Sequence, residues 1–226
     1  MKSVVYAIPD LHLPWTSWYR IEELAKRIKF DRRQKSNNVH VIQLGDLIDG
    51  YSWSRYPKSP EAVSAQLEWD QTLLAVDKLS KLIPEMTILE GNHCIRPMKK
   101  ALEAQLPKQL IKGLHEAFDV EGWNWHMGSR MYEHRGILYA HGDEFPIAAT
   151  NVGLAASRLG QSIVFGHTHQ ASIAYVNVFQ KSYFAANAGC IVDEDAVCFR
   201  YAAKNPRRSW QGYVEIVEGV PSLCPL

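Results

Sequence analysis

The chain has 226 residues, of which 46% are hydrophobic and 22% are charged, and its formal net charge is +1. This length can bury a substantial core, and the composition is typical of a globular protein rather than a disordered or fibrous one. A nearly neutral net charge excludes a chain that is basic all over, although it leaves room for a local basic patch. We expect a single domain over residues 1–226.

The sequence gives no sign of secretion or membrane insertion. The apolar run at residues 1–8 is too short for a secretory core, and no apolar stretch approaches the length that crosses a bilayer. The four cysteines form no C-x-x-C pair, which favours free thiols in a reducing compartment. We expect a cytoplasmic protein without membrane contact, and the sequence does not predict its oligomeric state.

Short apolar runs alternate with helical patterns in the first two-thirds of the chain. Strands are expected at residues 3–8, 39–44, 86–89, 137–140 and 162–165. Helical spacing covers Ile21 to Ile28 and residues 152–159, and a long helix is expected from Pro60, which follows Ser59. Its expected inward stripe consists of Leu73, Val76, Leu79 and Ile83.

The last part of the chain lacks helical patterns. Residues 173–179, 183–188, 197–201 and 213–217 resemble successive strands, and a hairpin is expected around Gly128. Strands that alternate with helices favour parallel pairing, whereas successive strands favour antiparallel pairing. The sequence therefore predicts an α/β fold with an added antiparallel region.

Polar motifs follow five of the predicted strands. They are Asp10-x-His12, Gly45-Asp46-x-x-Asp49, Gly91-Asn92-His93, His141-Gly142 and Gly166-His167-x-His169. Ligands of α/β sheets bind at the carboxyl ends of the strands, so these side chains are expected to meet. Buried without a cation, such imidazoles and carboxylates would be hard to satisfy. Their mixture of oxygen and nitrogen ligands suits manganese, iron, zinc or nickel.

These five motifs, in this order, resemble those of the calcineurin-like metallophosphoesterase superfamily. The resemblance implies a four-layer sandwich of two mixed β-sheets flanked by α-helices. It also implies two divalent metal ions, with manganese the first choice and iron, zinc, nickel or magnesium as alternatives. In such a centre, a hydroxide that bridges the two metals attacks the phosphate ester.

The resemblance also implies a role for each motif residue. The first metal would take Asp10, His12, Asp46 and His169, and the second would take Asp46, Asn92, His141 and His167. His93 would be the general acid that protonates the leaving oxygen, and Asp49 would orient it.

Two departures from the pattern indicate to which branch of the superfamily the chain is similar, and a third concerns Cys94. The protein serine/threonine phosphatase branch carries Asp-Arg-Gly where this chain has Asp49-Gly50-Tyr51, and it lacks a histidine at the position of His169. Both points argue against that branch and favour the group that contains phosphodiesterases, nucleases and small-molecule phosphatases. Cys94 stands where the family often has an acidic residue, and a tolerated small residue is preferred over a catalytic thiol.

Several residues could contact the substrate. Arg96 could clamp a phosphate with two hydrogen bonds or pair with Glu90, and Asn92 would serve both metal and substrate. Trp15, Trp53 and Tyr56 could stack on a base or cover a hydrophobic rim. Trp18 is expected to pack the first helix, and Tyr19 could either pack there or stack on a base. Two basic clusters, at residues 26–35 and 204–208, could track a phosphate backbone, but a solvated helix face is preferred for the first.

The expected function is therefore metal-dependent hydrolysis of phosphate esters. The sequence contains no inserted cap between the motifs, and an open site favours phosphodiesters such as nucleotides or nucleic acid. A phosphomonoesterase that acts on a small molecule or a phosphoprotein is the alternative. An inactive protein-binding scaffold is less favoured, because every expected ligand is present.

Overall fold

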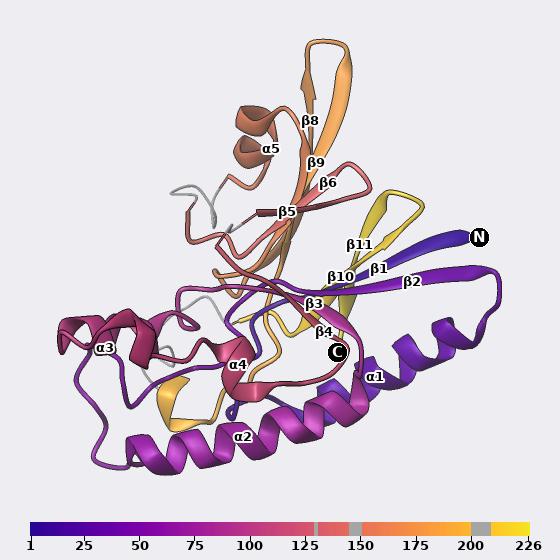
Figure 1. Ribbon diagram of the computed structural model, residues 1–226. Helices are drawn as coiled ribbons and strands as arrows, with labels where there is room; N and C mark the ends of the chain where they lie inside the picture. The colour runs from indigo at the N-terminus through magenta and orange to yellow at the C-terminus, as the bar shows by residue number, and fades with distance from the viewer. Residues whose placement is uncertain (129–130, 145–150, 200–208) are drawn as a thin grey trace.

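Two mixed β-sheets lie face to face, with helices on their outer faces (Figure 1). The computed structural model describes residues 1–128, 131–144, 151–199 and 209–226. The basic cluster at residues 204–208 lies outside the described residues. The expected α/β sandwich of two mixed sheets is confirmed.

The first sheet has the strand order β11-β10-β1-β2-β3-β4. Strands β1 to β4 pair in parallel, whereas β10 runs antiparallel to both β1 and β11. The strands are β1 (Lys2–Ile8), β2 (Asn37–Gln43), β3 (Met86–Leu89), β4 (Trp123–His126), β10 (Gly212–Val217) and β11 (Val220–Pro225).

The second sheet has the order β5-β6-β7-β9-β8. Here β6 pairs in parallel with β7 and β7 with β9, and the outer pairs β5–β6 and β8–β9 are antiparallel. The strands are β5 (Met131–His134), β6 (Ile137–Ala140), β7 (Ser162–Phe165), β8 (Ala171–Val178) and β9 (Lys181–Ala188).

The helices cover the two outer faces of this sandwich. The apolar residues of α1 and α2 pack on the first sheet, and those of α5 pack on the second. The helical segments are α1 (Trp18–Arg33), α2 (Ala65–Leu82), α3 (Arg96–Glu103), η1 (Lys108–Leu110), α4 (Leu114–Phe118) and α5 (Gly153–Leu159).

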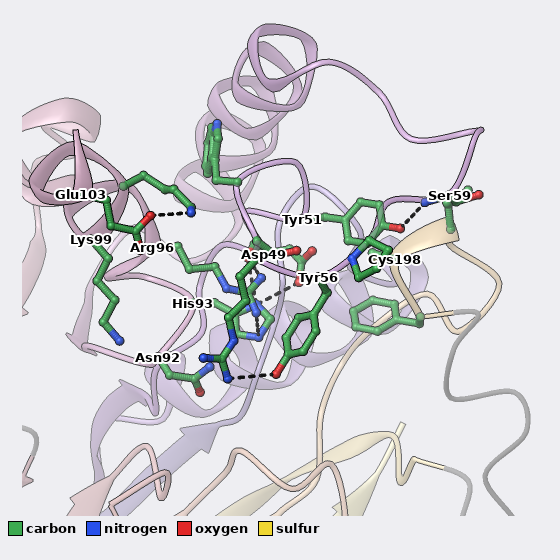
Figure 2. A pocket seen from close by; sticks show the side chains of 17 residues that line it. Asp49, Tyr51, Tyr56, Ser59, Asn92, His93, Arg96, Lys99, Glu103 and Cys198 are labelled. Atoms are coloured by element: carbon green, nitrogen blue, oxygen red, sulfur yellow. Dashed lines mark hydrogen bonds and ion pairs between the residues drawn. The ribbon is translucent and has the colours of Figure 1, made fainter.

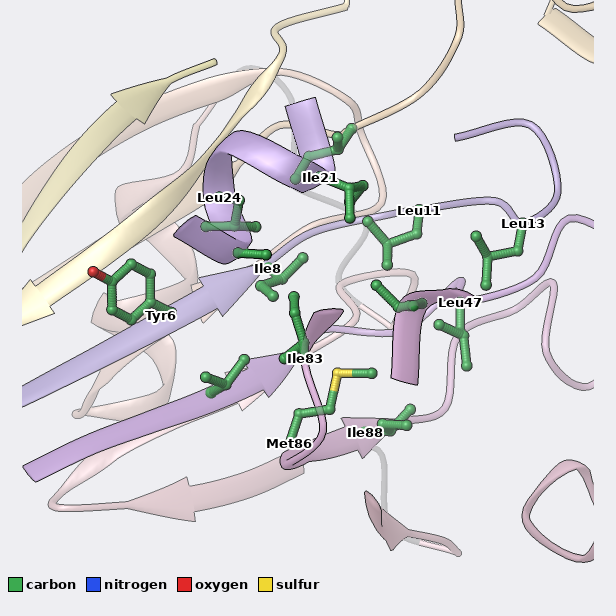
Figure 3. Packing of buried hydrophobic residues seen from close by; sticks show 14 of the residues in the cluster. Tyr6, Ile8, Leu11, Leu13, Ile21, Leu24, Leu47, Ile83, Met86 and Ile88 are labelled. Atoms are coloured by element: carbon green, nitrogen blue, oxygen red, sulfur yellow. The ribbon is translucent and has the colours of Figure 1, made fainter. Parts of the chain in front are cut away.

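Strand β1 shows how the sequence divides the core into layers. Side chains alternate across a strand, so Tyr6 and Ile8 face the helices while Val5 and Ala7 face the second sheet. Figure 3 shows Ile8 beside Ile21 and Leu24 of α1 on the helical side. A strand buried on both faces explains the unbroken apolar run.

Helix α2 starts later than expected. The sequence predicts a start at Pro60, but the helix begins at Ala65, because the side chain of Ser64 caps the amide of Leu67 at 3.2 Å. The expected inward stripe is wrong at Leu73, which is 38% exposed, and right at Val76 and Leu79.

Two further expectations are wrong, and so is one alternative. Residues 197–199 form a 3₁₀ turn that buries Cys198 and Phe199 in a cluster with Cys190, and residues 200–201 lie outside the described part. The described strands on either side of Gly128, β4 and β5, belong to different sheets and therefore do not pair as the expected hairpin. Tyr19 is 72% exposed rather than packed.

Strand β11 was not expected from the sequence. Its Pro221 and Pro225 are tolerated because β11 lies at the sheet edge.

Candidate active site

The polar motifs meet at one edge of the two sheets. Asp10 follows β1, Asp46 follows β2, Asn92 follows β3, His141 follows β6 and His167 follows β7. The parallel strands all deliver their carboxyl ends to this edge. Asp10, Asp46 and His141 are each at most 2% exposed, so the cluster is buried between the sheets.

One half of the cluster consists of Asp10, His12 and His169. Nε2 of His12 lies 3.1 Å from Nε2 of His169. Nε2 of His169 lies 3.1 Å from Oδ2 of Asp10, yet this oxygen makes no hydrogen bond of acceptable geometry. The ligand atoms of the three residues all lie within 4.8 Å of one another, close enough to share one cation.

The other half consists of Asp46, His141 and His167, with Asn92 beside them. Nε2 of His141 lies 2.9 Å from Oδ1 of Asn92, 3.2 Å from Oδ2 of Asp46 and 3.2 Å from Nδ1 of His167. One ring nitrogen with at most one proton cannot satisfy three such neighbours.

This geometry fits a bound divalent cation in each half. Two ligand atoms at about 2.1 Å from one cation lie about 3.0 Å apart at a right angle and about 3.4 Å apart in a tetrahedron. The spacings at His12–His169 (3.1 Å) and His141–His167 (3.2 Å) fall in that range. Nδ1 of His141 lies 3.3 Å from the carbonyl oxygen of Leu44, the arrangement that leaves Nε2 free for a metal.

The charge of the cluster also fits cations. Burial opposes a charge on His141, but the carboxylates of Asp46 and Asp10 raise its pKa to about 9. In the same way, burial opposes ionisation of Asp46, whereas His141 and His93 hold the pKa of this carboxyl well below its usual value. Burial likewise opposes ionisation of Asp10, but His141 and His169 lower the pKa of its carboxyl. Both buried carboxylates are therefore charged and need positive partners.

Backbone amides hold the carboxylates of Asp10 and Asp46 in place through hydrogen bonds to their Oδ1 atoms. The backbone amide of His167 donates to Oδ1 of Asp10 at 3.1 Å, and that of His93 donates to Oδ1 of Asp46 at 2.8 Å. Each Oδ1 is thus held by the backbone, and each Oδ2 is left to face the imidazoles. Such outer partners orient metal ligands.

Backbone strain gathers at the same place. His12, Asp46, His167 and His169 all have positive φ, between 49° and 68°. Residues other than glycine rarely adopt a positive φ, and such backbone strain is concentrated at functional sites.

Asp49 links the cluster to His93. Its Oδ1 lies 2.8 Å from Nδ1 of His12 and 3.0 Å from Nδ1 of His93. Burial works against the charge of Asp49, but the hydrogen bonds from His12 and His93 hold the pKa of its carboxyl far below the usual value. The sequence pointed to the contact with His93, while the contact with His12 was not expected.

Arg96 covers the outer nitrogen of His93. It donates to Nε2 of His93 at 2.7 Å and to the backbone oxygen of Asp49 at 2.8 Å. It takes part in no ion pair with Glu90 among the described residues, so the alternative of a structural salt bridge is wrong.

A pocket of about 880 Å³ opens beside His93 (Figure 2). Its walls come from the loop after β2, from α3 and from the turn at residues 197–199. Trp53 and Tyr56 line it, as do Asn92 and Arg96, whereas Trp15 packs against the buried cluster around Cys190 and does not line the pocket.

The structure assigns a structural role to Glu68 and argues against a catalytic role for Cys94. Glu68 of α2 is fully buried and accepts from the amides of Tyr51 and Ser52, both at 2.7 Å, so it anchors the loop that follows Asp49. No role for Glu68 was expected from the sequence. Cys94 is buried, which raises its pKa to about 12, so it stays a protonated thiol and fits the tolerated-residue interpretation.

The calcineurin-like phosphoesterase family model matches residues 3–171, and the chain belongs to this family. No curated protein matches the chain. The family and the clusters of possible metal ligands support metal-dependent hydrolysis of phosphate esters. No helix among the described residues has the length and apolar character needed to cross a bilayer.

Proposed function

We propose that the protein is a phosphodiesterase with two divalent metal ions, and that nucleotides or nucleic acid are its substrates. The observation that carries the proposal is the set of mutually facing nitrogen and oxygen atoms around His12–His169 and His141–His167, which a cation in each half would satisfy. Manganese is the first choice, because these ligands suit borderline and hard ions.

Seven residues would hold the two ions, with Asp46 shared between them. The first ion would take Asp10, His12, Asp46 and His169, and the second would take Asp46, Asn92, His141 and His167. When bound, such ions lower the pKa of a water between them and neutralise charge on the phosphoryl oxygens.

The remaining polar residues handle the proton and the phosphate. His93 gives a proton from Nε2 to the leaving oxygen, while Nδ1 keeps its contact with Asp49, which stabilises the charged ring. Arg96 leaves Nε2 of His93 for the oxygens of the incoming phosphate, since a guanidinium binds phosphate with two parallel hydrogen bonds. Departure of Arg96 thereby frees Nε2 of His93 to take up a proton from water, which the ring then gives to the leaving oxygen.

The experiment that tests this proposal combines metal analysis with two chromogenic esters. Metal content is measured in the purified protein, and hydrolysis of bis(p-nitrophenyl) phosphate and p-nitrophenyl phosphate is followed with Mn²⁺ and after chelation. The expected result is about two bound ions per chain and a higher rate with the diester. A higher rate with the monoester supports the phosphomonoesterase alternative, and absence of both metal and activity supports the scaffold alternative.

We also propose a cytoplasmic location. All four cysteines are free and buried, which suits a reducing compartment.

A further inference from the structure

The pocket beside His93 lies on one side of the proposed metal centre. It is lined by His93 and Asp49 and by one of the proposed metal ligands, Asn92. The other proposed metal ligands do not line it. A general acid must reach the leaving oxygen over hydrogen-bond distance. Given the proposed function, on which this step rests, the pocket receives the group that leaves and not the group that stays on phosphorus.

The size of the pocket indicates a large leaving group. Pockets of about 300–1,000 Å³ hold ligands far larger than a phosphate. At about 880 Å³, this pocket has room for a nucleoside and a further phosphate. A small alcohol would leave most of it filled with water.

The charges of the pocket indicate that the leaving group is anionic. Besides Arg96, which is assigned to the phosphate under attack, Lys99 and Lys100 reach the pocket from α3 and Arg55 reaches it from the loop after β2. Glu103 lies 2.6 Å from Lys100, but no acidic group within the described ranges pairs with Lys99 or Arg55. Burial, followed by the positive charges of Arg96 and Lys100, lowers the pKa of nearby Lys58. Cations therefore outnumber the acids that face them.

The aromatic rings of the pocket differ in what they can still bind. Tyr51 accepts from the amide of Ser59 and faces the ammonium of Lys58, 5.4 Å from its ring centre. Trp53 packs on Trp69 with ring centres 6.0 Å apart, so its ring already has an aromatic partner within the protein. Phe199 is only 7% exposed and packs on His12.

Tyr56 is the ring that remains open. It is 60% exposed, and its only ring contact among the described residues is the guanidinium of Arg55, 5.3 Å from the ring centre. Figure 2 shows Tyr56 near His93, with its hydroxyl joined to a guanidinium, that of Arg55, at 3.4 Å. A flat ring that rests on the opposite face of Tyr56 would lie between the proton donor and the surface.

We infer that the pocket binds the leaving side of a single-stranded nucleic acid, with one base stacked on Tyr56 and the next phosphate bound by Lys99. A base in a duplex is paired and stacked, so it cannot lay its face on Tyr56 without leaving the helix. Single strands offer both free bases and regularly spaced phosphates, and proteins bind them with aromatic platforms in basic grooves.

The test uses the Mn²⁺-loaded protein, thymidine trinucleotide and a trinucleotide of the same charge without bases. Since one base–aromatic stack is worth about 1–3 kcal/mol, kcat/KM should be about 5- to 150-fold higher with thymidine. Tyr56→Ala should remove that preference. The matched control is Tyr19→Ala, a tyrosine on α1 that is 72% exposed, and it should keep the preference.

The phosphate contact is read from salt dependence. Lys99→Ala should flatten the slope of log(kcat/KM) against log[salt] by about 0.7, the effect of one lost contact to a single strand. Lys29→Ala, an exposed lysine on α1, is the control and should leave the slope unchanged.

Bis(p-nitrophenyl) phosphate separates the two possible failures. If the protein hydrolyses this ester but treats the thymidine and base-free strands alike, the inference about the pocket is wrong and the proposed function stands. If it hydrolyses no ester with any added metal, the proposed function fails first. A preference for a phosphotyrosine peptide over the trinucleotide, or a slope changed by Lys29→Ala and not by Lys99→Ala, would also overturn the inference.

Discussion

Arg96 and His93 form the most consequential contact outside the metal cluster, because a guanidinium N–H points at the ring nitrogen proposed to protonate the leaving group, 2.7 Å away. While this contact lasts, Nε2 of His93 acts as an acceptor and cannot deliver a proton. A substrate phosphate is a stronger partner for Arg96 than a neutral imidazole is. The contact therefore couples phosphate binding to the release of Nε2, which can then take up the proton that goes to the leaving oxygen.

Replacement of Arg96 tests that coupling. Arg96→Ala should lower kcat/KM for bis(p-nitrophenyl) phosphate by about 10- to 150-fold, since hydrogen bonds to charged groups contribute about 1.5–3 kcal/mol. Arg96→Lys should restore only part of it, because lysine cannot form two parallel bonds. The inhibition constant of inorganic phosphate should rise in parallel. If Arg96 merely blocked His93, the alanine variant would be faster than the wild type.

His93→Ala tests the proposed division between acid and ligands. Turnover should fall by about 10²- to 10⁴-fold while both metals stay bound, because His93 is assigned to the proton and not to an ion. Nε2 of His93 lies 3.8 Å from Oδ2 of Asp46, near enough for a ligand role to need testing. Metal content separates the two roles, with Asp46→Asn as the control that should weaken both ions. Loss of metal from His93→Ala would make the acid assignment wrong.

Gly91→Ala tests the close packing behind the metal centre. A Cβ at this position would meet Oδ1 of Asp46 at 2.1 Å and its backbone nitrogen at 2.2 Å, so Asp46 would have to move. Since Asp46 is the proposed shared ligand, the variant should bind both ions much more weakly, as metal analysis after dialysis would show. Retention of both ions would mean that Asp46 can shift without leaving them.

The sequence predicted those parts of the molecule that depend on local pattern. The bounds of β3, β6 and β7 match the expected residues, because short apolar runs there end at a polar or glycine turn. The strand ends then placed the motif residues together. The 3₁₀ turn at residues 197–199 was missed because apolar residues in a turn and in a strand look alike without knowledge of what they pack on.

Contacts between distant residues were beyond such patterns. Asp49 and His12 are 37 residues apart, and nothing local indicates that one carboxylate serves both His12 and His93. The buried role of Glu68, by contrast, is indicated by its position in the sequence. It lies on the same helical stripe as Thr72, Val76 and Leu79, and a charged residue on a buried stripe indicates an internal partner.

Glu68→Gln should destabilise the protein through the loop after β2. An amide can accept from Tyr51 or Ser52 with its oxygen, but its NH₂ group then faces the other amide. Loss of one charge-assisted bond should lower the free energy of unfolding by about 1.5–3 kcal/mol in urea titrations. Asp77→Asn, which breaks an exposed pair with Lys81 on the same helix, is the control and should cost less than about 0.5 kcal/mol. Equal effects of the two changes would argue against an anchoring role.

His40 should make the two-sheet packing sensitive to acid. Its ring stacks on His134 of the second sheet, with ring centres 4.3 Å apart, and its Nε2 lies 3.3 Å from the hydroxyl of Thr87. Burial, and then the charges of His134 and Arg32, lower the pKa of His40 from 6.5 to about 4. Between these two values the unfolded chain binds a proton that the folded protein does not.

The free energy of unfolding should therefore fall as the pH drops from about 6.5 to about 4, and His40 should contribute nothing to the slope above that window. For this half-buried ring, solvent screening reduces the expected loss to about 1–2 kcal/mol. Urea titrations at pH 7.5 and pH 4.5 measure the loss in the wild type and in His40→Gln, where it should be smaller by that amount. His115→Gln, at an exposed histidine of α4, is the control for the replacement of a histidine by glutamine as such. An unchanged pH dependence in His40→Gln would mean that His40 titrates at its ordinary pKa and that the stacked pair tolerates charge.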